Sequence, residues 1–183
     1  VALTEGIARR LQAGGAAAPG LHFREGDVRS FALPATLDLM IALHACDTAT
    51  DHALHAGIVA QAALIVAAPC CHKQLRPQMC CPPPLAPMLR HGIHLGEQAE
   101  MLTDALRALW LEAQGYDTQV FEFVSLEHTA KNKMILAQRR ADAALPTGAA
   151  RRDAARAQAA QLMQFYGVRE QCLGTLLDAA ATA

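Results

Sequence analysis

Two short, almost unbroken apolar runs constrain the fold of this chain most. Residues 37–45 read LDLMIALHA and residues 62–69 read AALIVAAP. Runs of this length without polar alternation are typical of parallel strands covered on both faces. The residues between them, 51–60, predict a short helical connection. We therefore expect an α/β fold in which these strands lie in one sheet with a right-handed crossover.

The residues before the first run predict a helix and a strand. Apolar residues recur at helical spacing from Leu3 to Leu11, and the glycines at 14 and 15 end that pattern. Residues 21–28, LHFREGDV, alternate apolar and polar positions, which predicts a half-buried strand with a turn at its end.

The residues after the second run predict a loop, a helix, a hairpin and two further helices. Residues 74–95 contain five prolines and predict an ordered loop or lid. Helical periodicity follows at 97–115, and strands are predicted at 120–126 and 132–140. Only EHTAK separates these two strands, too few residues for a parallel crossover, so they form an antiparallel pair. The tail, 149–180, predicts two helices broken near Gly167.

Composition favours one folded domain in the reducing cytoplasm. The 183 residues are 52% hydrophobic and 18% charged, with a formal net charge of −1, which excludes disorder and a strongly basic nucleic-acid surface. The longest apolar run is far shorter than the ~20 residues that cross a bilayer. Cysteines occur as adjacent pairs at 70–71 and 80–81, a spacing that favours free thiols over a secreted disulfide framework.

Polar and reactive residues cluster where the predicted strands end. Asp27 follows the first strand, LHACDTATD spans 43–51 at the end of the second, and PCCH spans 69–72 at the end of the third. Ligands of open parallel sheets bind outside the carboxyl ends of the strands. The sequence therefore predicts one cleft lined by these three strand ends.

The segments LHACDTATDHAL and APCCHK, with FVSLEHTAKNKMIL downstream, resemble a family of S-adenosylmethionine-dependent methyltransferases marked by LHAC-x-TATD and PCC segments. A related pairing marks a eukaryotic family of tRNA ribose methyltransferases. The resemblance covers roughly residues 1–140 and implies a Rossmann-like class I methyltransferase sheet, mostly parallel with a carboxyl-terminal antiparallel hairpin. Residues 141–183 would form a helical extension.

The resemblance also implies the roles of individual residues. Asp27 and Val28 would hold the adenine of S-adenosyl-L-methionine, and His44 and Ala45 would lie beside its methionine part. His44, Asp47 and His72 are the expected catalytic residues, with the two histidines as bases because imidazole titrates near neutrality. The expected substrate contacts are Thr48, Asp51, Pro69, Cys70, Cys71, His128 and Asn132.

The expected reaction is methyl transfer to a nitrogen or oxygen of an acceptor, either RNA or protein, with RNA preferred. Such families carry a glycine-rich turn after the first strand and an acidic residue after the second, and neither precedes Leu3. We therefore expect residues 1–140 to be the carboxyl-terminal part of a methyltransferase domain.

Each of these residues also has a structural interpretation. Asp27 could make a turn, His44 could be a core histidine, and Thr50 or Asp51 could cap a helix. The cysteines could pack as small buried residues, and no metal site is expected because CCH-x7-CC is not a typical zinc spacing. A non-catalytic or zinc-stabilised interaction module is the alternative function.

Overall fold

The computed structural model describes residues 2–13, 21–31, 34–124 and 132–181. They divide into two compact units, residues 1–32 and 33–183. The division at residue 140 that the resemblance implies stays a prediction. The helices after residue 140 pack on α2 and α4 within the second unit.

The described residues of the first unit include the helix α1 (Ala2–Ala13), as the apolar spacing predicts. The predicted strand at 21–28 is wrong: these residues are mostly exposed and form no strand. A turn follows, in which the Ser30 amide donates to the Asp27 carbonyl over 3.0 Å. Alternation alone cannot make a strand, because a strand needs a neighbouring ladder, and no described strand pairs with this segment.

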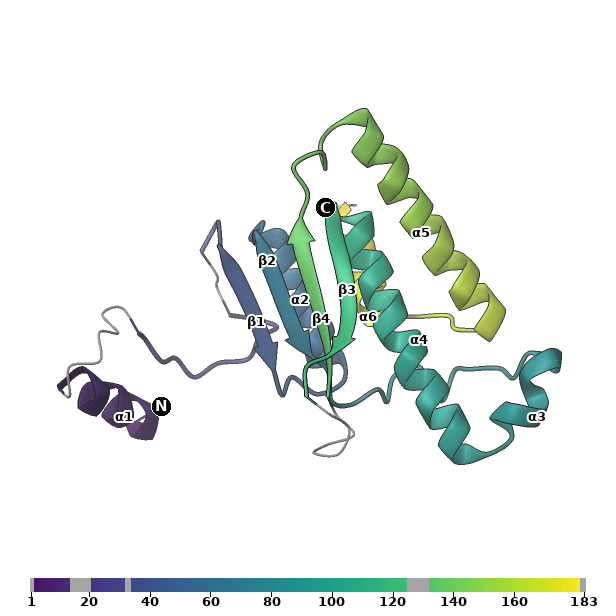
Figure 1. Ribbon diagram of the computed structural model, residues 1–183, viewed down its shortest axis with the longest axis horizontal. Coiled ribbons are helices and arrows are strands. Elements are labelled where there is room, and N and C mark those ends of the chain that lie inside the picture. Colours follow the sequence, from purple (N-terminus) through teal and green to yellow (C-terminus); the bar gives the residue numbers. More distant parts are fainter. Residues whose placement is uncertain (1, 14–20, 32–33, 125–131, 182–183) are drawn as a thin grey trace. The chain divides into compact units, whose positions relative to one another are not determined.

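The second unit is built on a four-stranded mixed sheet in the order β1-β2-β4-β3 (Figure 1). Strands β1 (Leu39–Leu43) and β2 (Leu64–Ala68) are parallel and are connected by α2 (Thr48–Val59), as predicted. Strands β3 (Tyr116–Glu122) and β4 (Lys133–Arg139) form the predicted antiparallel hairpin. Because β4 also pairs antiparallel with β2, the described sheet is mixed and not mostly parallel.

Helices cover one face of this sheet. Helix α2 packs on β1 and β2, α4 (Gly92–Ala113) packs on β3 and β4, and α6 (Cys172–Ala181) contacts both helices. Their core contains buried Leu54, Ile65, Leu106, Leu111 and Ile135.

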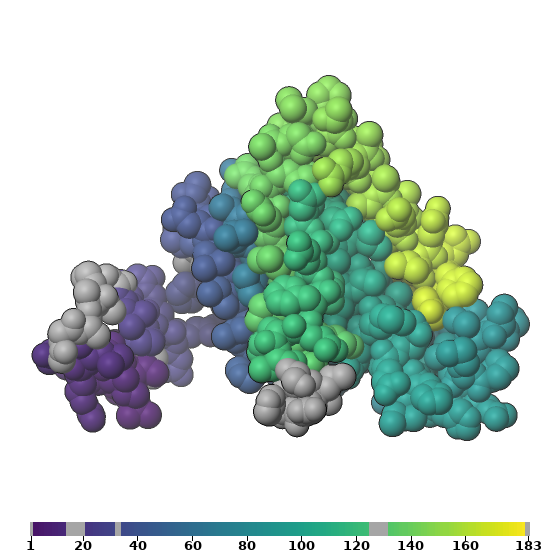
Figure 2. Space-filling view, viewed as in Figure 1, coloured from purple at the N-terminus to yellow at the C-terminus, as the bar shows by residue number. Residues whose placement is uncertain are grey.

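The other face of the sheet is open within the second unit. Leu39, Ile41 and Leu43 alternate along β1 and are 46%, 53% and 58% exposed. In Figure 2, side chains of the strands form the visible surface of the sheet. The expectation that the apolar run at 37–45 is covered on both faces is therefore not met, because the alternation of β1 places these residues opposite α2.

The proline-rich segment is more regular than expected. It contains a 3₁₀ turn, η1 (Pro83–Leu85), and a short helix, α3 (Ala86–Leu89), and α4 begins at Gly92. Proline is tolerated in the first turn of a helix, where its missing N–H has no intrahelical partner.

The tail forms two helices, as predicted. Helix α5 (Pro146–Tyr166) ends at Gly167, whose φ of 67° is readily adopted only by glycine, and α6 follows.

Candidate functional site

The loops after β1 and β2 lie side by side at one edge of the sheet. The two strands are parallel and in register, with Leu43 opposite Ala68, so both chains leave the sheet at the same edge. The Sγ atoms of Cys46 and Cys70 are 3.3 Å apart across the two loops. The structure thus brings the LHACDTATD and PCCH segments together, as the strand-end argument predicts.

Asp47 ties the two loops to each other. Its Oδ1 accepts hydrogen bonds from the backbone amides of Lys73 at 2.8 Å and Gln74 at 3.1 Å. Its backbone lies at φ 54° and ψ −124°, a conformation outside the left-handed helical region that residues other than glycine rarely adopt. These contacts give Asp47 a positioning role between the loops.

The remaining residues after β1 are accessible. His44 is exposed and has a φ of 56°, while Ala45 and Thr48 are half-buried. Helix α2 begins at Thr48 without a side-chain cap, so the expected capping by Thr50 or Asp51 is wrong. The Thr50 hydroxyl donates to the Ala45 carbonyl, a hydrogen bond that stabilises the turn between β1 and α2.

Asp51 belongs to a buried ionic network and not to the rim of the cleft. Its carboxylate accepts from the Arg107 guanidinium at 2.7 and 3.1 Å and from the Gln171 amide at 2.6 Å. Arg107 also donates to the Asp47 carbonyl at 2.8 Å and lies 3.5 Å from Asp104. Burial lowers the pKa of Arg107, but its bonds and charge pairing with Asp51 and Asp104 outweigh this and raise it.

His72 is the other end of this network. Its Nε2 lies 2.9 Å from Asp104 Oδ1, and its side chain is 3% exposed. Within the described part of the chain, its Nδ1 and the second Asp104 oxygen have no hydrogen-bond partner. His72 is therefore buried below the surface of the candidate site, whereas His44 is exposed to solvent.

Sequence reasoning missed Arg107, Asp104 and Gln171. Asp104 and Arg107 are three residues apart on α4 and lie on the same side of the helix as the buried Leu111, seven and four residues further on. Two charged residues on the apolar face of a helix were the available signal, since buried charges require partners.

A pocket of about 1090 Å³ lies between α3, α4 and the hairpin. Asn132 and Lys133, at the start of β4, contribute to its wall, as do Asp104, His91 and His94. The Asn132 amide donates to the Val124 carbonyl at 2.8 Å, and its Oδ1 is buried and has no hydrogen-bond partner among the described residues. His128, which was expected beside Asn132, lies outside the described residues.

A second pocket of about 590 Å³ adjoins the loop after β2. It is lined by Cys70, Cys71, His72, Lys73 and Arg76, and Glu100 contributes to both pockets. Pro69 is buried at the end of β2, so of the predicted PCC wall the two cysteines face this pocket.

Asp27 and Val28 lie in the first unit. The Asp27 carboxylate accepts from the Arg29 amide at 2.9 Å and from the Arg29 guanidinium at 2.5–3.1 Å. The turn interpretation of Asp27 therefore describes its local structure, while adenine contacts of Asp27 and Val28 stay predictions.

Residues 2–78 match a family described as a methyltransferase domain. The match covers α1, β1, α2, β2 and both strand-end loops, which is less than half of the 183-residue chain. It supports a methyltransferase family and methyl transfer as the general chemistry of the chain. Comparisons with curated proteins and with solved structures found no match. None of the described helices combines the length and the apolar character that crossing a bilayer requires.

Proposed function

We propose that this protein transfers a methyl group from S-adenosyl-L-methionine to a nitrogen or oxygen of an RNA acceptor. The observation that carries the proposal is the meeting of two loops, both inside the region matched to a methyltransferase domain, at one sheet edge. Ligands of parallel α/β sheets bind at this edge.

The residues after β1 fit a cofactor that lies across the end of the strand. His44 is exposed and Ala45 half-buried, so a bound molecule can reach both of them. When bound, S-adenosylmethionine supplies a methyl group on a positively charged sulfur, and its transfer to a lone pair leaves neutral S-adenosylhomocysteine. Asp27 and Val28 are proposed to hold its adenine, since a carboxylate accepts from an amino group.

His44 is the proposed base. An imidazole near neutrality can take the proton that the acceptor nitrogen or oxygen loses as it forms the new bond to carbon. His72 is less suited to this step because its Nε2 is already bonded to Asp104 in a buried site. Asp47 instead holds the loops in place through the Lys73 and Gln74 amides.

The acceptor is proposed to enter from the two pockets beside α4. In the pocket beside the loop after β2, Lys73 and Arg76 outnumber Glu100, and this excess of positive charge favours an anionic acceptor such as RNA over a neutral one. The other pocket carries one lysine, Lys133, beside three acidic residues, so the phosphates of the acceptor are proposed to lie in the first. Thr48, Cys70, Cys71 and Asn132 are the proposed contacts near the transferred methyl group.

Calorimetric titration with S-adenosylhomocysteine tests the proposal first. We expect saturable binding with one site, measured on the 183-residue chain and on the product of the whole reading frame that encodes it. Absence of binding to either folded protein would contradict the methyltransferase function and favour an interaction module.

Transfer of radiolabelled methyl groups then tests the acceptor and the base. Label should appear in RNA and not in protein when both fractions are offered. His44→Gln should reduce the rate by ~10²–10⁴-fold and remove the acid limb of the pH profile, where a catalytic base is protonated and inactive. His22→Gln, at an exposed histidine of the first unit, is the matched control and should retain activity.

A further inference from the structure

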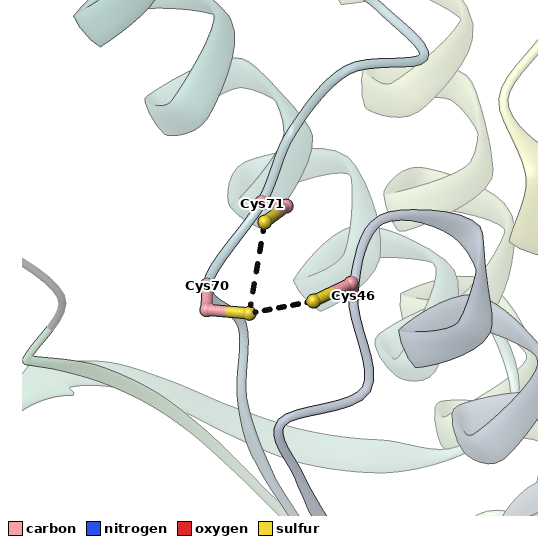
Figure 3. Close-up of side chains that lie close together, drawn as sticks. All are labelled: Cys46, Cys70 and Cys71. Carbon is pink, nitrogen blue, oxygen red and sulfur yellow. Dashed lines mark hydrogen bonds between the residues drawn. The ribbon is translucent and has the colours of Figure 1, made fainter.

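Three cysteine thiols converge where β1 and β2 end. Cys46 lies in the loop after β1, and Cys70 and Cys71 lie in the loop after β2. In Figure 3 the three sulfur atoms point toward one another. Cys70 Sγ is 3.3 Å from Cys46 Sγ and 3.8 Å from Cys71 Sγ, and all three atoms lie within 4.8 Å of one another.

These separations lie close to the spacing of thiolates that share a metal ion. Zinc–sulfur bonds of about 2.3 Å in a tetrahedral arrangement place any two sulfurs ~3.8 Å apart. The three thiols are free and not joined as a disulfide. Small side-chain rotations would bring all three sulfurs to bonding distance of one ion.

We propose that Cys46, Cys70 and Cys71 form a binding site for a thiophilic d¹⁰ cation, with Zn²⁺ as the ion of reference. The inference does not rest on the proposed methyl transfer. Among the described residues the group offers three ligands, so a fourth tetrahedral position would be left for water or an external ligand. Cys46 is exposed, which gives the ion an entry path.

The surroundings of the thiols suit such a site. Three thiolates at these distances would repel one another unless a cation lay between them. A divalent ion removes this repulsion and releases the thiol protons. Lys73 and Arg76 line the same pocket as Cys70 and Cys71 and offset the remaining negative charge.

The bound ion would join the two loops that Asp47 already connects. One ligand comes from the loop that carries His44, and two come from the loop that carries His72. The ion would therefore stabilise the edge of the sheet as well as occupy it, because it binds the folded arrangement and not the unfolded chain.

Cobalt titration of the whole reduced, metal-free protein tests the site. We expect one equivalent of Co²⁺ to give thiolate-to-cobalt charge-transfer absorption and the intense visible bands of tetrahedral coordination, and Zn²⁺ to abolish both. Zn²⁺ should also raise the melting temperature.

Cysteine variants assign the signal to these residues. Cys70→Ser should weaken binding by more than the ~10–100-fold that loss of an outer-shell partner costs. Cys46→Ala, at the exposed ligand, provides a second test if Cys70→Ser fails to fold. Cys81→Ser, at an exposed cysteine outside the group, should retain wild-type binding.

Two results would overturn the proposal. One is the absence of thiolate-to-cobalt absorption in folded, reduced protein. The other is absorption that persists unchanged in folded Cys46→Ala or Cys70→Ser protein. Because neither readout uses S-adenosylmethionine, failure of this site is distinct from failure of the proposed methyl transfer.

Discussion

Arg107 on α4 and Asp51 on α2 form an ion pair of 2.7 Å in which both side chains are only 1% exposed. Gln171, just before α6, donates to the same carboxylate, so the pair links three helical segments far apart in the sequence. Arg107 also reaches the Asp47 carbonyl, which connects this network to the loops of the candidate site.

Arg107→Ala is expected to destabilise the second unit strongly. Removal of the guanidinium leaves Asp51 and Asp104 buried without their cation, and breaking a buried pair in this way costs ~3–5 kcal/mol. Urea unfolding measures the loss. Arg156→Ala, at an exposed arginine of α5, is the matched control and should change the free energy of unfolding by less than ~0.5 kcal/mol. A small effect at Arg107 would contradict the network.

Asp47→Ala is expected to cost ~1–3 kcal/mol, because the Lys73 and Gln74 amides lose a charged acceptor. Asp47→Asn keeps a carbonyl oxygen, so it should lose less than half as much. Thermal unfolding of both variants provides the comparison. Equal losses would show that the negative charge, and not the pair of hydrogen bonds, stabilises the loops.

Gly174→Ala should destabilise the packing of α6 on α4. A Cβ at this position would lie 2.9 Å from two ring carbons of Trp110, and such overpacking costs ~1–3 kcal/mol. Gly96→Ala is the matched control on α4, where the nearest atom is an Arg76 guanidinium nitrogen at 3.9 Å. There the greater helix propensity of alanine should stabilise by up to ~1 kcal/mol. The denaturant concentration at the midpoint of unfolding should therefore fall in Gly174→Ala and rise in Gly96→Ala.

Alkylation of Cys70 and Cys172 should stay slow up to strongly alkaline pH. The hydrogen bond with Cys46 and burial raise the pKa of Cys70 to about 11, and burial followed by the Asp51 charge raises that of Cys172 to about 11. Only the thiolate reacts, so both rates should keep rising until about pH 11. Peptide mass spectrometry after timed iodoacetamide treatment follows each cysteine separately.

The same raised values imply a pH dependence of stability. The folded state holds these two protons more tightly than the unfolded state, so their contribution is complete below the ordinary thiol pKa and is lost as the pH rises toward 11.

Zn²⁺ should protect Cys70 from alkylation and leave Cys172 reactive; equal protection of both would point to a general effect of the ion on the fold.

Asp27→Ala should weaken S-adenosylhomocysteine binding by ~1–3 kcal/mol if the carboxylate accepts from the adenine amino group. Arg29→Ala serves as the comparison, because it removes the guanidinium that now holds the Asp27 carboxylate. Calorimetry on both variants is decisive: unchanged affinity in folded Asp27→Ala protein would end this assignment.

Local patterns in the sequence were sufficient to predict most of the helices and strands. The unbroken apolar runs predicted β1 and β2, the five-residue EHTAK connection predicted the antiparallel β3–β4 pair, and Gly167 marked the break between α5 and α6. These features depend on backbone preference and on which residue types follow one another, which a sequence displays directly.

The polar ends of the two apolar runs were also sufficient to predict that the LHACDTATD and PCCH segments meet. Parallel strands connected by a helix must leave the sheet at the same edge, whatever their side chains are.

The partners of the individual side chains were decided only by the tertiary structure. Apolar and polar residues alternate at 21–28 as in a strand, yet no described strand pairs with this segment. Without such a neighbour the alternating pattern does not produce a strand. Asp51 looked like a cap or a rim residue, but Arg107, 56 residues away, neutralises its charge, and the Gln171 amide, 120 residues away, donates a further hydrogen bond to it. The meeting of Cys46 with Cys70 and Cys71 likewise follows from the register of β1 and β2. Whether a polar group is buried depends on the charges and donors that distant segments bring to it, because desolvation must be compensated at that point in space.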